Sequence, residues 1–147
     1  MKITICGSIA FIDEMQILKN KLENLGHEVE IPPLEIIDGS GEKMSVKEFY
    51  SIRKKSDETI KWIWDRKEQA IKDHFKKVKW ADAILVLNND KNGILNYIGG
   101  NTFLEIGIAF YCNKKIFLFH PIPEISYKEE ILGMSPMVIN EDLSLIV

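Results

Sequence analysis

The sequence has only two cysteines, Cys6 and Cys112, among its 147 residues, and its three histidines, His27, His74 and His120, are scattered. So few cysteines do not suggest the disulfide framework of a small secreted domain. The chain opens without a charged segment followed by an apolar one, so we expect a reducing, cytoplasmic environment. No histidine has a Cys or His partner at ligand spacing, and we therefore expect no structural zinc site and no bound metal.

Long apolar runs and an excess of positive charge are also lacking. The most hydrophobic segment is broken by Glu105, Asn113, Lys114 and Lys115, and it falls short of the roughly 20 residues that cross a membrane. A net charge of -3 provides no general basic field for a nucleic-acid polymer. Because 46% of the residues are hydrophobic and 28% charged, we expect a soluble single domain over residues 1–147, with neither a membrane nor a nucleic-acid partner.

Short β-rich runs alternate with segments of helical periodicity throughout the chain. This alternation predicts an α/β fold: a doubly wound, flavodoxin-like five-stranded parallel sheet with helices on both faces. Residues 34–45 are rich in Gly, Ser and charge and are expected to form a loop, which could act as a mobile lid. The expected strands lie in "KITIC", "HEVEIPP", "ADAILVLNND", "KKIFLF" and "PMVI", and the helices lie within residues 12–28, 45–79 in two pieces, 100–112 and 123–132.

Polar turns follow three of these segments, and a doubly wound sheet places them at one crevice. In such folds ligands bind outside the carboxyl ends of the strands, where the strand order reverses. If the first and third strands are neighbours, "CGSIAF", "NND" and the start of "GGNTFLE" meet there. These turns are the candidate binding site.

Glu105 is a carboxylate inside the apolar run "YIGGNTFLEIGIAFYC". One interpretation is a capping box, with Thr102 as N-cap and Glu105 at the third helical position. The other is a functional carboxylate at the crevice, because the surrounding apolar residues indicate a helix buried all round against the sheet. A positioned carboxylate can attack a sugar carbon, as in retaining glycosyl transfer.

The other candidate groups each have a structural alternative. The turn Cys6–Gly7–Ser8–Ile9 could bind an anion or hydroxyl through its backbone N–H groups and its serine, or it could be an ordinary turn between strand and helix. The group Asn88, Asn89 and Asp90 could bind a base edge or sugar hydroxyls, or simply form a polar turn. His74 lies on an apolar helical stripe, where a histidine is either a core residue or a functional one. Neither a Gly-x-Gly-x-x-Gly motif nor a Gly-Lys-Ser/Thr motif is present, so dinucleotide and P-loop sites are disfavoured.

Taken together, "CGSI", "ADAILVLNND" and "GGNTFLEIGIAF" resemble the nucleoside 2-deoxyribosyltransferase superfamily, which includes the deoxynucleoside 5'-monophosphate N-glycosidases. The resemblance follows the chain in order except for residues 34–60, and its most specific part is the run from Asn101 to Gly107. It implies cleavage or transfer at the N-glycosidic bond of a nucleoside or nucleotide, without a cofactor, through a glutamate nucleophile and a glycosyl-enzyme.

The resemblance assigns roles residue by residue. Glu105 falls on the nucleophile, and Asn89 falls on an aspartate that contacts the base. The turn Cys6 to Ile9 lies beside the sugar or phosphate, and Gly100, Asn101 and Thr102 form the polar turn before the nucleophile. The family's second carboxylate falls on His74, with Asp73 one position away, so one of these two is expected to assist departure of the base.

Some positions depart from the family. The monophosphate glycosidases have an arginine just after "CGSI", where this chain has Ala10 and Phe11, which weakens the assignment of a 5'-monophosphate. Lys128 of a neighbouring protomer could restore a phosphate contact, and the helix bearing Trp62 and Trp64 is expected to form a homo-oligomer. A non-catalytic nucleotide-binding or sensing module of the same fold remains an alternative. A cytokinin-activating phosphoribohydrolase relative and an NAD-cleaving enzyme remain open as well.

Overall fold

The computed structural model describes residues 1–147. Its main sheet is parallel and has the strand order β2-β1-β5-β6-β7. Counted along the chain within this sheet, the order is 2-1-3-4-5, the flavodoxin-like arrangement, as predicted. The strands are β1 (Lys2–Cys6), β2 (Glu28–Glu30), β5 (Ala83–Val86), β6 (Lys115–Leu118) and β7 (Met137–Val138).

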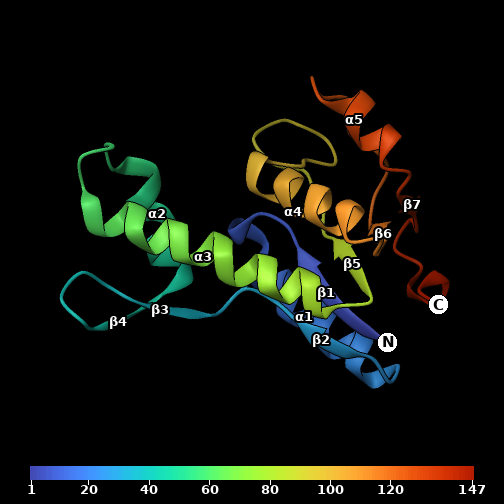
Figure 1. Ribbon diagram of the computed structural model, residues 1–147, viewed down its shortest axis with the longest axis horizontal. Helices are drawn as coiled ribbons and strands as arrows, with labels where there is room; N and C mark the ends of the chain where they lie inside the picture. The colour runs from blue at the N-terminus through green and yellow to red at the C-terminus, as the bar shows by residue number, and fades with distance from the viewer.

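Helices cover both faces of this sheet, as Figure 1 shows. Alternate residues of β1 point to opposite faces. Ile3 and Ile5 belong to the core under α1 (Ile12–Asn24), whereas Cys6 belongs to the core under α3 (Lys61–Trp80) and α4 (Gly100–Tyr111). Thr4 lies on the face of Cys6, because its hydroxyl donates to the Lys77 carbonyl of α3 at 2.8 Å. The α3/α4 face therefore receives the last side chain of β1.

The remaining elements are short. Helix α2 (Val46–Lys55) begins at Ser45, whose hydroxyl accepts from the Glu48 N–H. Helix α5 (Lys128–Gly133) precedes β7, and 3-10 turns cover Ile9–Phe11 and Leu143–Leu145. None of the helices combines the length and apolarity that crossing a membrane requires.

The expected loop at residues 34–45 is instead an antiparallel hairpin, so that prediction is wrong. Strands β3 (Glu35–Ile37) and β4 (Lys43–Ser45) pair across a tight turn. The Asp38 carboxylate closes the turn by accepting from the Ser40 and Glu42 N–H groups, and Gly41 has a positive φ of 87°. The glycine and serine content that indicated a loop belongs to this turn, and the flanking strands are too short to show alternation.

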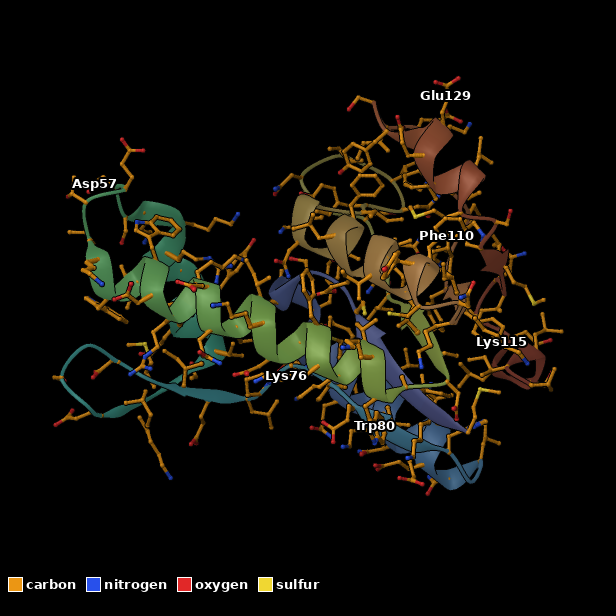
Figure 2. The ribbon with its side chains drawn as sticks, in the orientation of Figure 1. Asp57, Lys76, Trp80, Phe110, Lys115 and Glu129 are labelled. Atoms are coloured by element: carbon orange, nitrogen blue, oxygen red, sulfur yellow. The ribbon has the colours of Figure 1, made fainter.

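The hairpin, α2 and the first half of α3 form an arm that projects beyond the sheet (Figure 1). Figure 2 shows Asp57 at the far end of this arm and Trp80 at the other end of α3, beside the sheet. Trp62 packs against Phe49 of α2, with ring centroids 6.0 Å apart, and the Trp64 indole N–H donates to the Asp57 carbonyl. These tryptophans are half-buried by packing within the arm, so they do not present the free apolar surface expected of them.

Helix α4 was expected to be buried on all sides, and this prediction is wrong because one side of it is exposed to solvent. Its inner face buries Glu105, Ile106 and Ala109, while Leu104 and Phe110 are each 52% exposed. Phe110 can be seen in Figure 2. One apolar face of α4 therefore remains in solvent.

Candidate active site

A cleft of about 720 Å³ lies where α2, α3 and the start of α4 meet the turn after β1. Gly7, Ser8 and Ile9 of that turn line it, together with the polar turn Gly100, Asn101 and Thr102. Glu105, His74 and Asp73 also line it. The fold thus brings together most of the residues that the sequence indicated.

Glu105 lies one helical turn further into α4 than the capping-box interpretation requires. The helix begins at Gly100, and Gly99 is its N-cap, because the Phe103 N–H bonds the Gly99 carbonyl at 2.9 Å. Thr102 is therefore inside the helix and caps nothing, and the capping-box interpretation is wrong. Glycine is accepted at the N-cap almost as well as threonine, so Gly99 and Gly100 let the helix start earlier. The first-turn N–H groups have no side-chain cap.

Glu105 is 2% exposed, and its carboxyl has few partners. Its Oε1 accepts from the Asn101 side-chain amide N–H at 3.0 Å, and the side-chain oxygen of Asn101, Oδ1, accepts from Lys67 Nζ at 3.4 Å. His74 Nε2 lies 3.8 Å from the same Oε1. The other oxygen, Oε2, has no hydrogen-bond partner.

Burial is the main cause of the shifted pKa values of Glu105, His74 and Lys67. It raises the pKa of Glu105 to about 8, while the Cys6 thiol and the Lys67 charge act in the opposite direction. Burial, reinforced by the charge of Lys77, lowers the pKa of His74 to about 4. Burial also lowers the pKa of Lys67 to about 8, helped by the charge of Arg53. Near neutral pH the carboxyl is therefore mainly protonated and the imidazole neutral.

A second polar cluster lies at the Ser8 turn. Lys91 Nζ donates to the Ser8 hydroxyl at 2.8 Å and to the Tyr50 hydroxyl at 2.6 Å. The Arg53 guanidinium and the Lys54 ammonium lie 5.3 and 5.4 Å from the Tyr50 ring. This end of the cleft is strongly cationic, which suits an anionic ligand.

The Asn88 group lies outside the cleft. The Asn88 amide donates to the His120 and Pro121 carbonyls and its oxygen accepts from the His120 N–H, so it ties β5 to the segment after β6. Asn89 Oδ1 lies 3.1 Å from His120 Nε2, and Asp90 accepts from the Asn96 N–H. These contacts favour the polar-turn interpretation.

Three further residues that the sequence indicated lie at different places relative to Glu105 and the cleft. Cys6 contributes a buried side chain beside Glu105 and does not line the cleft. Asp73 lines the cleft, but its exposed carboxylate accepts from Gln69 and Lys76. Lys128, the first residue of α5, pairs with Glu124, which precedes the helix, and does not line this chain's own cleft.

Four residues of the site were not predicted from the sequence: Tyr50, Arg53, Lys67 and Lys91. The first three lie on the amphipathic helices α2 and α3, where polar residues at helical spacing look like ordinary solvent-facing positions. Lys91 follows the polar turn "NND" and looked like part of a loop. The one available signal was the high density of lysine and arginine in residues 53–67, and the fold is needed to show which of them face Ser8.

The arrangement combines a carboxyl that can attack or donate a proton, an adjacent imidazole and a cationic pocket. A carboxyl buried at the wall of a cleft with one free oxygen is a candidate nucleophile. Its neighbouring imidazole can take up and release a proton. The cationic pocket can hold a phosphate.

No protein-family model matches the chain, and no curated protein matches it. The solved structures that are similar to it include two enzymes. A 2-deoxyribosyltransferase from Bacillus psychrosaccharolyticus is 18% identical, with a TM-score of 0.49 over 80% of this chain and 71% of that one. The Clostridium botulinum CMP N-glycosidase BcmB is 17% identical, with a TM-score of 0.45 over 94% of this chain and 85% of that one. One is named as a deoxyribosyltransferase and the other as an N-glycosidase, the two kinds of enzyme in the family that the sequence motifs resemble. The fold assignment rests on the strand order, and the roles of the site residues rest on contacts within the chain.

Proposed function

We propose that the protein cleaves or transfers the N-glycosidic bond of a nucleoside or nucleotide, with Glu105 as the nucleophile. The observation that carries the proposal is the Glu105 carboxyl, which is buried at the wall of the cleft, is anchored through one oxygen by Asn101, and has its other oxygen free. A carboxylate held in this way can attack an anomeric carbon, and no metal or cofactor is required for that step.

His74 is the better candidate for the group that assists the departing base. Its Nε2 lies 3.8 Å from Glu105 Oε1, whereas the Asp73 carboxylate is occupied by Gln69 and Lys76. The proton of the neutral Glu105 carboxyl passes to His74 as substrate closes the site. The carboxylate then bonds to C1' while the C1'–N bond breaks, and the imidazolium gives its proton to the leaving nitrogen.

The second half of the reaction breaks the ester between C1' and Glu105. A water molecule, or the nitrogen of a second base, bonds to C1' as the ester oxygen leaves. The proton of that water or base returns to the Glu105 and His74 pair, which restores the starting state. Hydrolysis and transfer therefore differ only in the group that enters the cleft.

The cationic pocket supports a phosphorylated substrate, even though the family's arginine is missing. Lys91 binds Ser8 directly, and Arg53 and Lys54 approach from α2. The missing arginine would follow the turn after β1, whereas these three charges lie elsewhere in the chain. They can hold a 5'-phosphate beside Ser8. We therefore favour a nucleoside monophosphate over a nucleoside.

The proposal includes a homo-oligomer in which a neighbouring protomer brings Lys128 toward the cleft. The exposed Leu104 and Phe110 side chains of α4 provide an apolar face that a second copy could cover. Light scattering should show an assembly larger than one chain, and a monomer at all concentrations tested contradicts this part of the proposal.

The test is a chromatographic screen for free base, run on ribo- and deoxyribonucleosides and their monophosphates. We expect release by the wild-type protein and none by Glu105→Gln, which keeps the size of the side chain. Melting curves of both proteins show whether the variant is folded. Equal release by a folded Glu105→Gln protein contradicts the proposal.

A binding or sensing module without turnover is the second candidate. The observation in its favour is that burial keeps Glu105 mainly protonated near neutral pH, because its pKa is about 8. A neutral carboxyl can donate a hydrogen bond to a ligand, but it is a poor nucleophile. Ligand-dependent shifts in melting temperature without release of base would establish this alternative.

A further inference from the structure

Three potential metal ligands from three different elements meet beneath the cleft. They are the Cys6 thiol at the end of β1, the His74 imidazole of α3 and the Glu105 carboxyl of α4, and their ligand atoms all lie within 4.8 Å of one another. All three side chains are buried, with exposed fractions of 0%, 6% and 2%. Their separations along the chain gave no hint of this cluster, and the sequence predicted no metal.

The cluster leaves several buried polar atoms without a partner. Neither His74 Nδ1 nor His74 Nε2 has a hydrogen bond, and Glu105 Oε2 has none either. Buried polar atoms in native proteins are almost always paired, and each exception calls for an explanation. The three side chains meet at one place, so an ion that accepts electron pairs from several directions would pair one imidazole nitrogen of His74 and a carboxyl oxygen of Glu105.

We propose that Cys6, His74 and Glu105 form a binding site for a divalent transition-metal ion of the zinc type. One sulfur, one nitrogen and one oxygen donor make a set that Zn²⁺ prefers and that Mg²⁺ and Ca²⁺ avoid. A thiolate and a carboxylate together balance the two charges of the ion, and the neutral imidazole adds none, so the occupied site is neutral overall. That balance favours its burial.

The cleft provides the fourth position of the ion. His74 and Glu105 line the cleft, whereas Cys6 lies behind them. Three protein ligands and one open position form the arrangement typical of zinc sites that bind a water or an exogenous ligand. Donor atoms around tetrahedral zinc lie roughly 3.3 to 3.8 Å apart given the metal–ligand distances. The three ligand atoms lie within 4.8 Å of one another, so they need to close by at most about 1.5 Å.

Metal binding at this site would oppose the proposed reaction, and this part of the inference rests on the proposed function. A Glu105 oxygen bound to the ion cannot bond to C1', and a His74 nitrogen bound to the ion cannot carry a proton. The site would therefore switch the enzyme off when zinc is bound and release activity when a chelator removes it.

The binding test uses the metal-free full-length protein, titrated with Zn²⁺ against a coloured chelator. We expect one bound ion for each chain and no competition by Mg²⁺. Cys6→Ser and His74→Ala should weaken zinc binding by at least about 100-fold, because changes even behind the direct ligands cost about 10- to 100-fold. The matched controls Cys112→Ser and His27→Ala should leave the affinity unchanged. Equal affinity in Cys6→Ser and wild type, or no binding, overturns the site.

Binding of Co²⁺ provides a second measurement. It does not require Cys6→Ser or His74→Ala to fold, since neither variant is used. Co²⁺ bound to a thiolate gives a charge-transfer absorption in the near ultraviolet, and we expect this band in the wild-type protein and in Cys112→Ser. A band that is lost in Cys112→Ser, or absent from the wild type saturated with Co²⁺, contradicts Cys6 as a ligand.

The regulatory part is tested on the same protein by measuring base release with and without one equivalent of Zn²⁺. We expect release to fall in proportion to occupancy and to return when a chelator is added. Unchanged release by zinc-saturated protein overturns the regulatory part. A protein that binds zinc through Cys6 but, when free of zinc, releases no base from any substrate confirms the site and removes the proposed function instead.

Discussion

His74 Nε2 lies 3.8 Å from Glu105 Oε1, and both side chains are almost completely buried. Burial disfavours the charged form of each group, so the pair is mainly neutral near pH 7. A proton that moves from the carboxyl to the imidazole creates two opposite charges that stabilise each other. This pair is the chemical centre of the account.

The first prediction separates His74 from its neighbour Asp73. His74→Gln should lower the rate of base release by about 10²- to 10⁴-fold, the usual contribution of a general acid or base. Asp73→Asn should change the rate only a few-fold, because that carboxylate is exposed and already paired with Lys76. Steady-state rates on the best substrate of the screen measure both effects. The reverse order of sensitivity would assign the role to Asp73.

The second prediction concerns the cationic pocket. Lys91→Gln should raise KM for a nucleoside monophosphate at least about tenfold, the effect of losing one charge-assisted hydrogen bond of about 1.5 kcal/mol. It should leave the KM for the matching nucleoside nearly unchanged. Lys43→Gln, on the hairpin strand β4, is the matched control and should affect neither substrate. An equal rise for both substrates would show that Lys91 does not read the phosphate.

The third prediction is a dependence of folding stability on pH. The folded pKa of Glu105 is about 8 against an ordinary value of 4.5, so between these values the folded protein binds one more proton than the unfolded chain. Stability therefore falls as pH rises, by up to about 1.4 kcal/mol per pH unit. His74 acts oppositely between about 4 and its ordinary 6.5, where the folded protein binds one proton fewer and stability rises with pH.

These two contributions oppose each other below pH 6.5, the ordinary pKa of His74, and only the Glu105 contribution remains from there to about 8. Denaturant unfolding should show the wild-type protein losing stability over that upper range. Glu105→Gln should lose much less, because the amide does not titrate. Parallel stability curves for the two proteins would contradict the raised pKa.

The fourth prediction uses two glycines with opposite surroundings. A Cβ at Gly7 would lie 2.9 Å from the Leu87 carbonyl oxygen, whereas a Cβ at Gly107 meets nothing within 4 Å. Gly7→Ala should destabilise the protein by about 1 to 3 kcal/mol through overpacking. Gly107→Ala, inside α4, should stabilise it by about 0.5 to 1 kcal/mol. Thermal melting of the two variants measures the expected loss of stability in Gly7→Ala and the expected gain in Gly107→Ala. A Gly7→Ala protein as stable as wild type would show that the turn after β1 can move.

The sequence was sufficient for the architecture because the buried strands are continuous apolar runs that period and length identify. Ala83–Val86 is such a run, and Lys2–Cys6 is a short β-rich segment that ends at a glycine turn. The hairpin at 35–45 was missed because its strands are three residues long, and its turn residues dominate the composition. Local pattern cannot distinguish such a hairpin from a loop.

Part of the candidate site could likewise be predicted from the sequence, and part of it could not. Glu105 and the Ser8 turn stood out because a carboxylate is unusual in an apolar run and a glycine turn after a strand is a recognisable feature. The start of α4 was misplaced because both threonine and glycine are acceptable N-caps. Lys67 and Lys91 could not be found, since their importance comes from contacts with Asn101 and Ser8 over 34 and 83 residues of chain.

The mass of the protein during turnover shows whether Glu105 is the nucleophile. The protein is mixed with its best substrate, quenched in acid and examined by intact-mass and peptide mass spectrometry. A nucleophilic Glu105 predicts an added mass equal to that of the sugar or sugar phosphate less one water, located on the peptide containing Glu105 and absent from Glu105→Gln. Rapid release of base without any adduct, or an adduct on another residue, would contradict the account.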